Sequence, residues 1–194
     1  MDPVSITTTL QNRLPNNGKF YLVAIDGRGG SGKSTLATEL AAGLPGFTVL
    51  NGDEYFEPTP GELAWGAFND ERFDQEVIRP LQTSRTFVYR PYDWHASPHI
   101  TDRPVTIDRG FMLERSHIFG LDLPWDLKIW VETPKSVCLE RALVRETLPC
   151  ERVLRVWQEV WQPAEDAYIA SYHPKRRADI VVDGTRPFLE QLVA

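Results

Sequence analysis

Short apolar runs alternate with longer segments of helical spacing along most of the chain. Residues 20–25 form an apolar run of aromatic, aliphatic and β-branched side chains, which predicts a strand buried on both faces. A glycine-rich turn follows it. From residue 33 leucines recur every fourth position, until Gly43 and Pro45 end the helical pattern. This order of strand, turn and helix predicts the first unit of an α/β fold.

The same alternation recurs further along the chain. Strands are predicted at residues 47–51, 104–108, 127–131 and 179–182, and helices at residues 5–13, 70–81, 135–145 and 151–172. Strands that alternate with helices predict a parallel sheet with helices on both faces. The carboxyl ends of its strands lie along one edge, where ligands of such folds bind. The long connection at residues 85–103 predicts a binding loop.

The composition fits one domain of ordinary size. With 194 residues and 42% hydrophobic content the chain can bury one core, and its six Trp argue against disorder over most of the length. We therefore predict a single domain over residues 1–194. The net charge of −6 argues against a general nucleic-acid surface, because a phosphate backbone favours excess Lys and Arg. An anion site must then be local.

Cysteine usage and hydropathy both favour the cytoplasm. Cys138 and Cys150 are too few for a disulfide framework, which favours a reducing compartment. No basic segment with an apolar run opens the chain, and no stretch approaches the roughly 18 apolar residues of a membrane span. We expect a cytoplasmic protein without a membrane partner. Its histidines are scattered and predict no metal site: His95, His99, His117 and His173.

The glycine-rich turn carries a phosphate-binding motif. Residues 27–34 read Gly-Arg-Gly-Gly-Ser-Gly-Lys-Ser and fit Gly-x-x-x-x-Gly-Lys-Ser between a strand and a helix, as the motif requires. Glycines let backbone N–H groups curl around phosphate oxygens at the start of a helix. Lys33 would bridge the β- and γ-phosphates, Ser34 suits a magnesium ion, and Thr35 is placed to reach the α-phosphate. The candidate nucleotide-binding residues are Gly27, Arg28, Gly29, Gly30, Ser31, Gly32, Lys33, Ser34 and Thr35.

Residues 24–35 resemble the phosphate loop of uridine kinase-like P-loop NTPases. Further stretches resemble the same family in order: residues 51–56 its acidic second-strand segment, 69–74 and 90–94 its acceptor side, 141–146 its lid and 178–184 its last strand. The likeness extends over about residues 20–185. It implies a three-layer α/β/α P-loop NTPase fold with a five-stranded parallel sheet, ATP and Mg2+ as cofactors, and a small-molecule hydroxyl acceptor.

The acceptor side is expected to begin at Asp53, which follows the second predicted strand. A carboxylate there would orient the acceptor hydroxyl and take its proton, with Glu54 as the nearby alternative. The resemblance also points to Asp53, while a turn-forming Asp is the structural alternative. A candidate acceptor pocket comprises Tyr55, Arg72, Arg90, Tyr92, Asp93 and Trp94. Core packing competes with this role for Tyr92 and Trp94, and a solvated helix face competes for Arg72.

A second carboxylate is expected at the magnesium site. Residues 104–108 predict a buried strand ending in Asp108, as a Walker B strand ends, so Asp108 joins Ser34 as a candidate metal ligand. The resembled family presents Glu-Gly here, whereas this chain has Asp-Arg-Gly at residues 108–110. Either Asp108 or Arg109 is therefore expected to face the metal site. An arginine there would repel the metal and bind an acidic acceptor or phosphate.

A short lid is predicted over residues 141–152. Arg141 and Arg145, four residues apart, share one helix face. The resemblance implies that such a lid closes over ATP and that its arginines stabilise the transferring phosphoryl group, with Arg152 as a further candidate. A solvated helix face is the alternative for the arginine pair. Residues 183–185 follow the last strand, where this fold often lets the backbone touch adenine; a simple turn explains them equally well.

Together these patterns predict a phosphotransferase that moves the γ-phosphoryl group of ATP onto a hydroxyl of a small molecule, with a nucleoside as one candidate acceptor. Its catalytic candidates are Lys33, Asp53, Arg141 and Arg145. The alternative is a nucleotide-binding regulator or slow ATPase without an acceptor, suggested by residues 108–110 and the short lid. The sequence is compatible with a homodimer.

Overall fold

The computed structural model describes residues 4–55, 68–91, 102–145 and 150–193. The chain divides into two compact units, one formed by residues 1–50 and 109–194 and the other by residues 51–108. The single kinase domain predicted over residues 1–194 stays a prediction. Within the described ranges, no helix is both long enough and apolar enough to cross a membrane.

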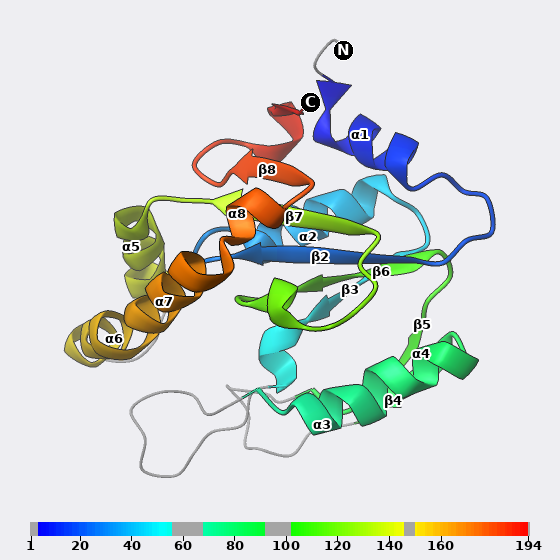
Figure 1. Cartoon of the computed structure of the whole chain (residues 1–194), viewed down its shortest axis with the longest axis horizontal. Coiled ribbons are helices and arrows are strands. Elements are labelled where there is room, and N and C mark those ends of the chain that lie inside the picture. The colour runs from blue at the N-terminus through cyan, green and yellow to red at the C-terminus, as the bar shows by residue number, and fades with distance from the viewer. Residues whose placement is uncertain (1–3, 56–67, 92–101, 146–149, 194) are drawn as a thin grey trace. The chain divides into compact units, whose positions relative to one another are not determined.

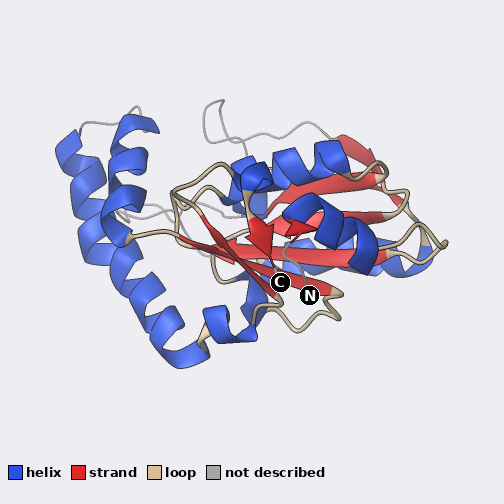
Figure 2. Ribbon diagram, turned by 90° about the horizontal axis from the view of Figure 1, so that it is seen from above, coloured by secondary structure: helices blue, strands red, loops and turns tan. Residues whose placement is uncertain are grey.

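The first unit is built on a five-stranded sheet (Figure 1). Its strands lie in the order β3 (Phe47–Asn51), β6 (Gly110–Glu114), β2 (Tyr21–Gly27), β7 (Leu127–Glu132) and β8 (Ile180–Asp183). Strand β2 pairs in parallel with both β6 and β7, and β7 pairs in parallel with β8. Figure 2 shows the strands in red with helices in blue on either side. The predicted three-layer α/β/α fold with a five-stranded parallel sheet is confirmed.

Helix α1 follows strand β1 and helix α2 follows strand β2. Helix α1 (Ile6–Arg13) begins after Ser5, whose side chain accepts a hydrogen bond from the Thr8 amide and so caps the helix. Helix α2 (Lys33–Gly43) follows the glycine-rich turn after β2. Strands β1 (Val4–Ser5) and β9 (Leu192–Val193) pair antiparallel, which places the two ends of the chain side by side (Figure 1).

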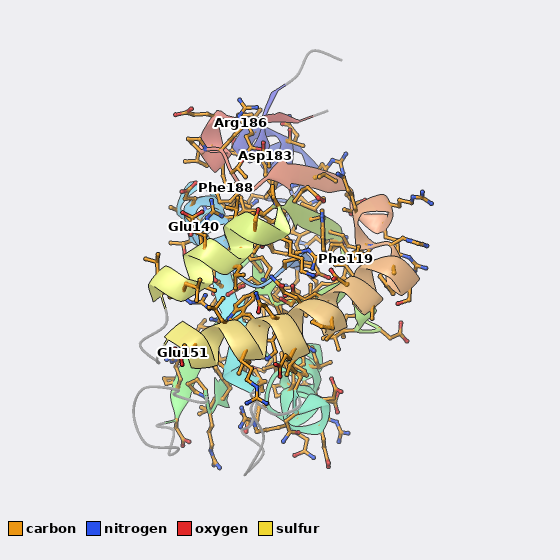
Figure 3. The ribbon with its side chains drawn as sticks, turned by 90° about the vertical axis from the view of Figure 1, so that its left-hand side faces the viewer. Phe119, Glu140, Glu151, Asp183, Arg186 and Phe188 are labelled. Carbon is orange, nitrogen blue, oxygen red and sulfur yellow. The ribbon has the colours of Figure 1, made fainter. Side chains whose placement is uncertain are left out.

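The second half of the first unit is mainly helical. It comprises η3 (Ile118–Gly120), α5 (Lys135–Arg145), α6 (Cys150–Val156), the π-helical segment η4 (Trp157–Trp161), α7 (Gln162–Tyr172), α8 (Pro174–Arg177) and η5 (Phe188–Glu190). Segments α6, η4 and α7 follow one another without a break, so residues 150–172 form one continuous helical run. Helices α5 and α6 lie side by side in Figures 1 and 3.

Alternation along β2 sends neighbouring side chains to opposite faces of the sheet. Val23 and Ile25 are fully buried in a core cluster with leucines of α1 and α2. Asp26 therefore points to the other face, where its carboxylate meets Tyr168 of α7. Asp26 directly precedes the glycine-rich turn. Its contact with Tyr168 therefore places α7 close to that turn.

The second unit contains a helical run and a hairpin. The run comprises α3 (Asp70–Phe73), the π-helical segment η2 (Asp74–Ile78) and α4 (Arg79–Thr83), and it follows the short 3-10 helix η1 (Gly52–Tyr55) in the chain. Strands β4 (Thr86–Tyr89) and β5 (Arg103–Thr106) pair antiparallel. The Tyr55 ring packs with those of Phe68, Phe73 and Tyr89 and forms the aromatic centre of this unit.

The strand predicted at residues 104–108 does not belong to the five-stranded sheet, so this prediction is wrong. Residues 103–106 form β5, which pairs with β4 in a separate two-stranded sheet and is exposed at three of its four positions. The place beside β2 is taken by β6, whose five residues are all buried. The alternating Val105 and Ile107 resemble a strand more strongly than Gly-Phe-Met-Leu-Glu does, because β6 contains no β-branched residue.

Candidate functional site

The glycine-rich turn lies between a strand and a helix. Residues 28–32 connect β2 to α2, and Gly30 and Gly32 have φ angles of 74° and 103°, which favour glycine. The Ser31 carbonyl accepts a hydrogen bond of 3.0 Å from Thr133 Oγ1, which fixes the turn against the residue after β7. The turn thus leads its amides into a helix N-terminus, where anions bind.

Lys33 is ordered at the edge of this turn. Its side chain is buried, and Nζ donates hydrogen bonds to the Arg28 carbonyl at 2.9 Å and to Ser116 Oγ at 3.2 Å. Ser116 in turn donates to the Gly27 carbonyl at 3.0 Å. The ammonium group is therefore held beside the turn, as the motif requires of its lysine. Ser116 carried no recognisable signal in the sequence.

Ser34 and Glu114 form a hydroxyl–carboxylate pair. Ser34 Oγ donates to Glu114 Oε1 at 2.9 Å, and Glu114 is the buried last residue of β6. Glu114 lies opposite Ile25 in the register of β6 with β2, so the pair stands at the carboxyl ends of two neighbouring parallel strands. Hydroxyl and carboxylate oxygens are the donors that Mg2+ prefers. These two residues fit the ligand pattern of a P-loop magnesium site.

The structure corrects the expectation for Asp108 and Arg109. Arg109 lies at the amino end of β6, where its carbonyl accepts from the Tyr21 amide and Nη1 donates to the Pro45 carbonyl at 3.1 Å. Its guanidinium also covers the Phe47 ring, 5.2 Å from the centroid. Arg109 does not face the turn, which follows the carboxyl end of β2. Asp108 precedes β6 and ends no strand of the large sheet, so the predicted Walker B position is wrong.

Asp26 anchors the start of the turn. Its fully buried carboxylate accepts hydrogen bonds from the amides of Gly27, His117 and Phe119 and from Tyr168 Oη. Burial raises the pKa of Asp26, while the hydrogen bonds from Tyr168, Phe119 and Gly27 and the charge of Lys33 oppose the rise. Asp26 thus ties β2 both to the segment after β6 and to α7. In the sequence, Asp26 is marked only by its place in the stretch that resembles the family's phosphate loop.

His117 lies in this buried cluster. It has a left-handed backbone with φ of 66°, and its ring lies 4.3 Å from that of Tyr168. Burial, and then the charges of Arg115 and Lys33, lower the pKa of His117 to about 4. The imidazole is therefore neutral near pH 7, with Nε2 buried and without a hydrogen-bond partner in the described part of the chain.

Arg28 points towards α7. Its Nη1 lies 3.3 Å from Glu165 Oε2 and its Nη2 lies 2.6 Å from Asp166 Oδ1. The other oxygen of Glu165 accepts a hydrogen bond of 2.6 Å from the Gly29 amide. Arg28 is one of the predicted nucleotide-binding residues, and its side chain pairs with the carboxylates of Glu165 and Asp166. Neither carboxylate was singled out from the sequence, because both lie within a long amphipathic helix.

Arg141 also contacts the turn. Its guanidinium donates to the carbonyls of Ser31 at 3.3 Å, Gly30 at 3.4 Å and Gly184 at 2.9 Å. A cavity of about 360 Å³ adjoins it, lined by Gly32, Thr35, Glu39, Arg141, Gly184, Thr185, Arg186, Pro187 and Phe188. Figure 3 shows Asp183, at the end of β8, near Arg186 and Phe188. Residues 183–185 form a turn, because Asp183 Oδ1 accepts from the Thr185 amide, and two of them also line the cavity.

The structure describes one of the other lid candidates, Arg145. Arg145 is exposed at the last position of α5. Residues 146–149 and the side chain of Arg152 lie outside the described part of the chain. The proposed lid function of Arg141 and Arg145 stays a prediction.

The acceptor candidates lie in the second unit. Asp53 is exposed in η1, where its amide donates to Asn51 Oδ1 at 2.8 Å. Tyr55 is fully buried, and burial raises its pKa above the ordinary value for tyrosine. Arg72 donates to the Glu54 carbonyl at 2.8 Å and stacks over Tyr55. Tyr55 and Arg72 therefore contribute to the packing of this unit.

The other acceptor candidates are partly described. Glu54, the alternative base, already accepts hydrogen bonds from Tyr89 Oη at 2.8 Å and Arg103 Nη1 at 2.9 Å. Arg90 is exposed and pairs with Asp102 at 3.0 Å. Tyr92, Asp93 and Trp94 lie outside the described residues.

Comparison with known proteins agrees with this geometry. No protein-family model matches the chain. A uridine kinase from Macrococcus caseolyticus is 25% identical over an alignment of 187 residues, and the match covers 84% of this chain and 88% of that kinase. A cytidylate kinase from Haloarcula marismortui is 29% identical over 143 residues; these cover 68% of this chain but only 62% of that protein, less than two thirds of its length.

The fold is also found among solved structures. A protein from Silicibacter sp. TM1040, described as a candidate fructose transport system kinase, superposes with a TM-score of 0.70 at 22% identity, covering 91% of this chain and 97% of that chain. This likeness concerns the fold, while the uridine kinase shares sequence over most of both chains. The chain is thus a relative of the uridine kinase-like P-loop kinases.

Proposed function

We propose that the chain is an ATP-dependent kinase that transfers the γ-phosphoryl group to a hydroxyl of a small molecule, a phosphotransferase with an alcohol group as acceptor. The observation that carries this proposal is the placement of Lys33, Ser34 and Glu114 around one turn at the carboxyl ends of β2 and β6. A cation, a hydroxyl and a carboxylate in this arrangement match the parts with which P-loop enzymes hold nucleotide phosphates and magnesium.

The nucleotide is proposed to bind along α2. The amides of Gly30 and of residues 32–34, together with the Lys33 ammonium, would hold the phosphates. The adjoining cavity of about 360 Å³ would hold the adenosine, and its volume falls in the usual range for small-molecule sites. Arg141 lies between the turn and this cavity, so we assign it to the nucleotide side of the site.

Magnesium is proposed to bind between Ser34 and Glu114. When bound, it neutralises charge that develops on the phosphates. Among the described residues no group of three or more His, Cys, Asp or Glu side chains could hold a metal alone. A hydroxyl and one carboxylate are enough for Mg2+, which usually keeps several waters and phosphate oxygens as its other ligands.

The acceptor is proposed to be a nucleoside or a related alcohol, with Asp53 as the base. Support comes from the place of Asp53 two residues after β3, from its resemblance to the family's acidic segment, and from relatives that are named uridine kinase and cytidylate kinase. A carboxylate within reach of the acceptor hydroxyl would take its proton during transfer. The cytoplasmic location and the homodimer stay predictions.

The alternative function is a nucleotide-binding regulator or slow ATPase, and one of the two sequence features that suggest it is weakened by the structure. It was suggested by the altered residues 108–110, but the carboxylate beside Ser34 is Glu114, and it is intact. An ADP-release assay over nucleosides, nucleotides, sugars and pantothenate-like alcohols separates the two. Stimulation of turnover by one class, with a phosphorylated product in mass spectrometry, is the expected result. ATP binding with no stimulation by any acceptor would favour the regulator.

A further inference from the structure

The carboxylate of Glu165, in helix α7, accepts a hydrogen bond from the phosphate-binding turn. Glu165 is buried in α7, and its Oε1 accepts the Gly29 amide at 2.6 Å while its Oε2 lies 3.3 Å from Arg28 Nη1. One side chain therefore contacts two successive residues of the turn. A hydrogen bond from an amide to a carboxylate is about twice as strong as a neutral one, and more so when buried.

The helix that carries Glu165 is packed closely on the turn. A Cβ placed on Gly29 would lie 2.6 Å from Trp157 Cη2 and 3.3 Å from Glu165 Oε1, so Gly29 fits between these two side chains. Trp157 is itself buried against Ala142 of α5. Residue 157 belongs to the π-helical segment of the continuous run 150–172, and such segments are frequent at functional sites. Glu165 thus belongs to a helical run that packs against the turn through Trp157.

The charges around Glu165 balance. Arg28 contacts both Glu165 and Asp166, and Asp166 also pairs with Lys135 of α5 at 2.6 Å. The network contains two cations and two anions. A buried carboxylate with this compensation does not present a net negative charge to an incoming phosphate. Burial raises the pKa of Glu165, while the Gly29 amide and the charges of Lys33 and Arg28 oppose the rise.

We infer that Glu165 is a positioning residue for nucleotide binding: by accepting the Gly29 amide and holding Arg28, it fixes the phosphate-binding turn in the shape that receives the phosphates. This inference rests on the proposed function and adds to it a residue that acts through the turn. The same carboxylate links the turn to the helical run that starts at residue 150.

The test is the affinity of the intact chain for Mg·ATP, measured by titration calorimetry without any acceptor. Glu165→Ala removes both contacts and should weaken binding about tenfold. Glu165→Gln keeps an acceptor oxygen of the same reach and should weaken binding no more than about threefold. Glu165→Asp keeps the charge but withdraws the oxygen by one methylene, and should resemble the alanine variant.

Glu159→Ala is the matched control, because Glu159 pairs with Arg155 on the exposed side of the same helical run. Its ATP affinity should stay within about twofold of the wild type. The KM of the acceptor should not change in any Glu165 variant, whereas a general loss of structure would alter it. If the alanine variant fails to fold, the order of the glutamine and aspartate variants decides the question.

Equal ATP affinity in wild type and Glu165→Ala would overturn the inference. Tighter binding by Glu165→Gln or Glu165→Ala would also overturn it, since the carboxylate would then compete with phosphate for the Gly29 amide. A wild-type chain that binds no Mg·ATP would sink the proposed function, and this inference with it. That outcome is recognised from the wild-type titration alone.

Discussion

Ser34 Oγ and Glu114 Oε1 are joined by a hydrogen bond of 2.9 Å that links the first turn of α2 to the end of β6. We predict that Glu114→Gln lowers turnover about 100-fold or more and raises the Mg2+ concentration needed for half-maximal activity, because an amide oxygen binds magnesium less well than a carboxylate. Steady-state kinetics over a magnesium series measures both effects.

Asp108→Asn serves as the comparison for that variant. Since Asp108 precedes β6 and ends no strand of the large sheet, its replacement should leave magnesium dependence within about twofold of the wild type. A strong effect of Asp108→Asn together with a weak effect of Glu114→Gln would restore the original assignment from sequence.

Lys33→Ala should lower kcat/KM for ATP about 1,000-fold, because the ammonium held over the turn is the cation that meets the phosphates. Lys175→Ala, which removes an exposed lysine 3.5 Å from Glu132, is the control and should change little. Circular dichroism should show the same secondary structure for both variants. Retained transfer by the Lys33 variant would contradict its assigned role.

Gly29→Ala should destabilise the fold by roughly 1–3 kcal/mol and weaken ATP binding, because its Cβ would lie 2.6 Å from Trp157 Cη2. Gly120→Ala is the matched change, since a Cβ there has no atom within 4 Å, and it should stay within about 0.5 kcal/mol of the wild type. Urea unfolding compares the two free energies. Equal stability of both variants would mean that the turn can move away from Trp157.

His117 should make the fold sensitive to acid. Its pKa is about 4 in the folded chain against 6.5 ordinarily, so the unfolded chain binds more protons between these values and stability is lost as pH falls. His117→Asn keeps a residue that tolerates positive φ and removes the titration. Between pH 7 and pH 4.5 the wild type should lose roughly 2 kcal/mol more unfolding free energy than this variant. Parallel losses in urea titrations would refute the prediction.

Asp53→Asn should slow turnover about 100-fold while ATP affinity stays within about twofold, because the proposed base acts on the acceptor. Glu54→Gln tests the alternative base. Its carboxylate already accepts from Tyr89 and Arg103, so its loss should lower stability more than turnover. Pre-steady-state measurement of phosphoryl transfer distinguishes the two, and a larger chemical defect in the Glu54 variant would reverse the assignment.

The sequence predicts the backbone of the glycine-rich turn well because each signal there is local. The apolar strand, the glycines and the following helix are neighbours in the chain, and the structure confirms all three. The prediction places the strand beside β2 at residues 104–108 because β6 is short and lacks β-branched residues, while the segment at 104–107 alternates like a strand. Burial on both faces of β6 comes from its neighbours in space, which periodicity does not show.

Contacts between distant segments account for the site residues that the sequence does not predict. Glu165 lies 136 residues after Gly29, and Tyr168 lies 142 residues after Asp26. In sequence both belong to a helix whose spacing fits ordinary packing, and nothing marks them as partners of the turn. Charged residues on a predicted amphipathic helix are usually solvated, so only the fold distinguishes Glu165 from Glu159.

The two hydrogen bonds of the Lys33 ammonium have a consequence for how the site meets its ligand. A free lysine side chain loses up to about 2 kcal/mol of rotamer entropy when it is fixed. Here the Arg28 carbonyl and Ser116 have already immobilised it, so that loss belongs to folding and is absent from nucleotide capture. The cationic centre is preorganised, so we expect Ser116 to contribute to nucleotide affinity even where it touches no phosphate.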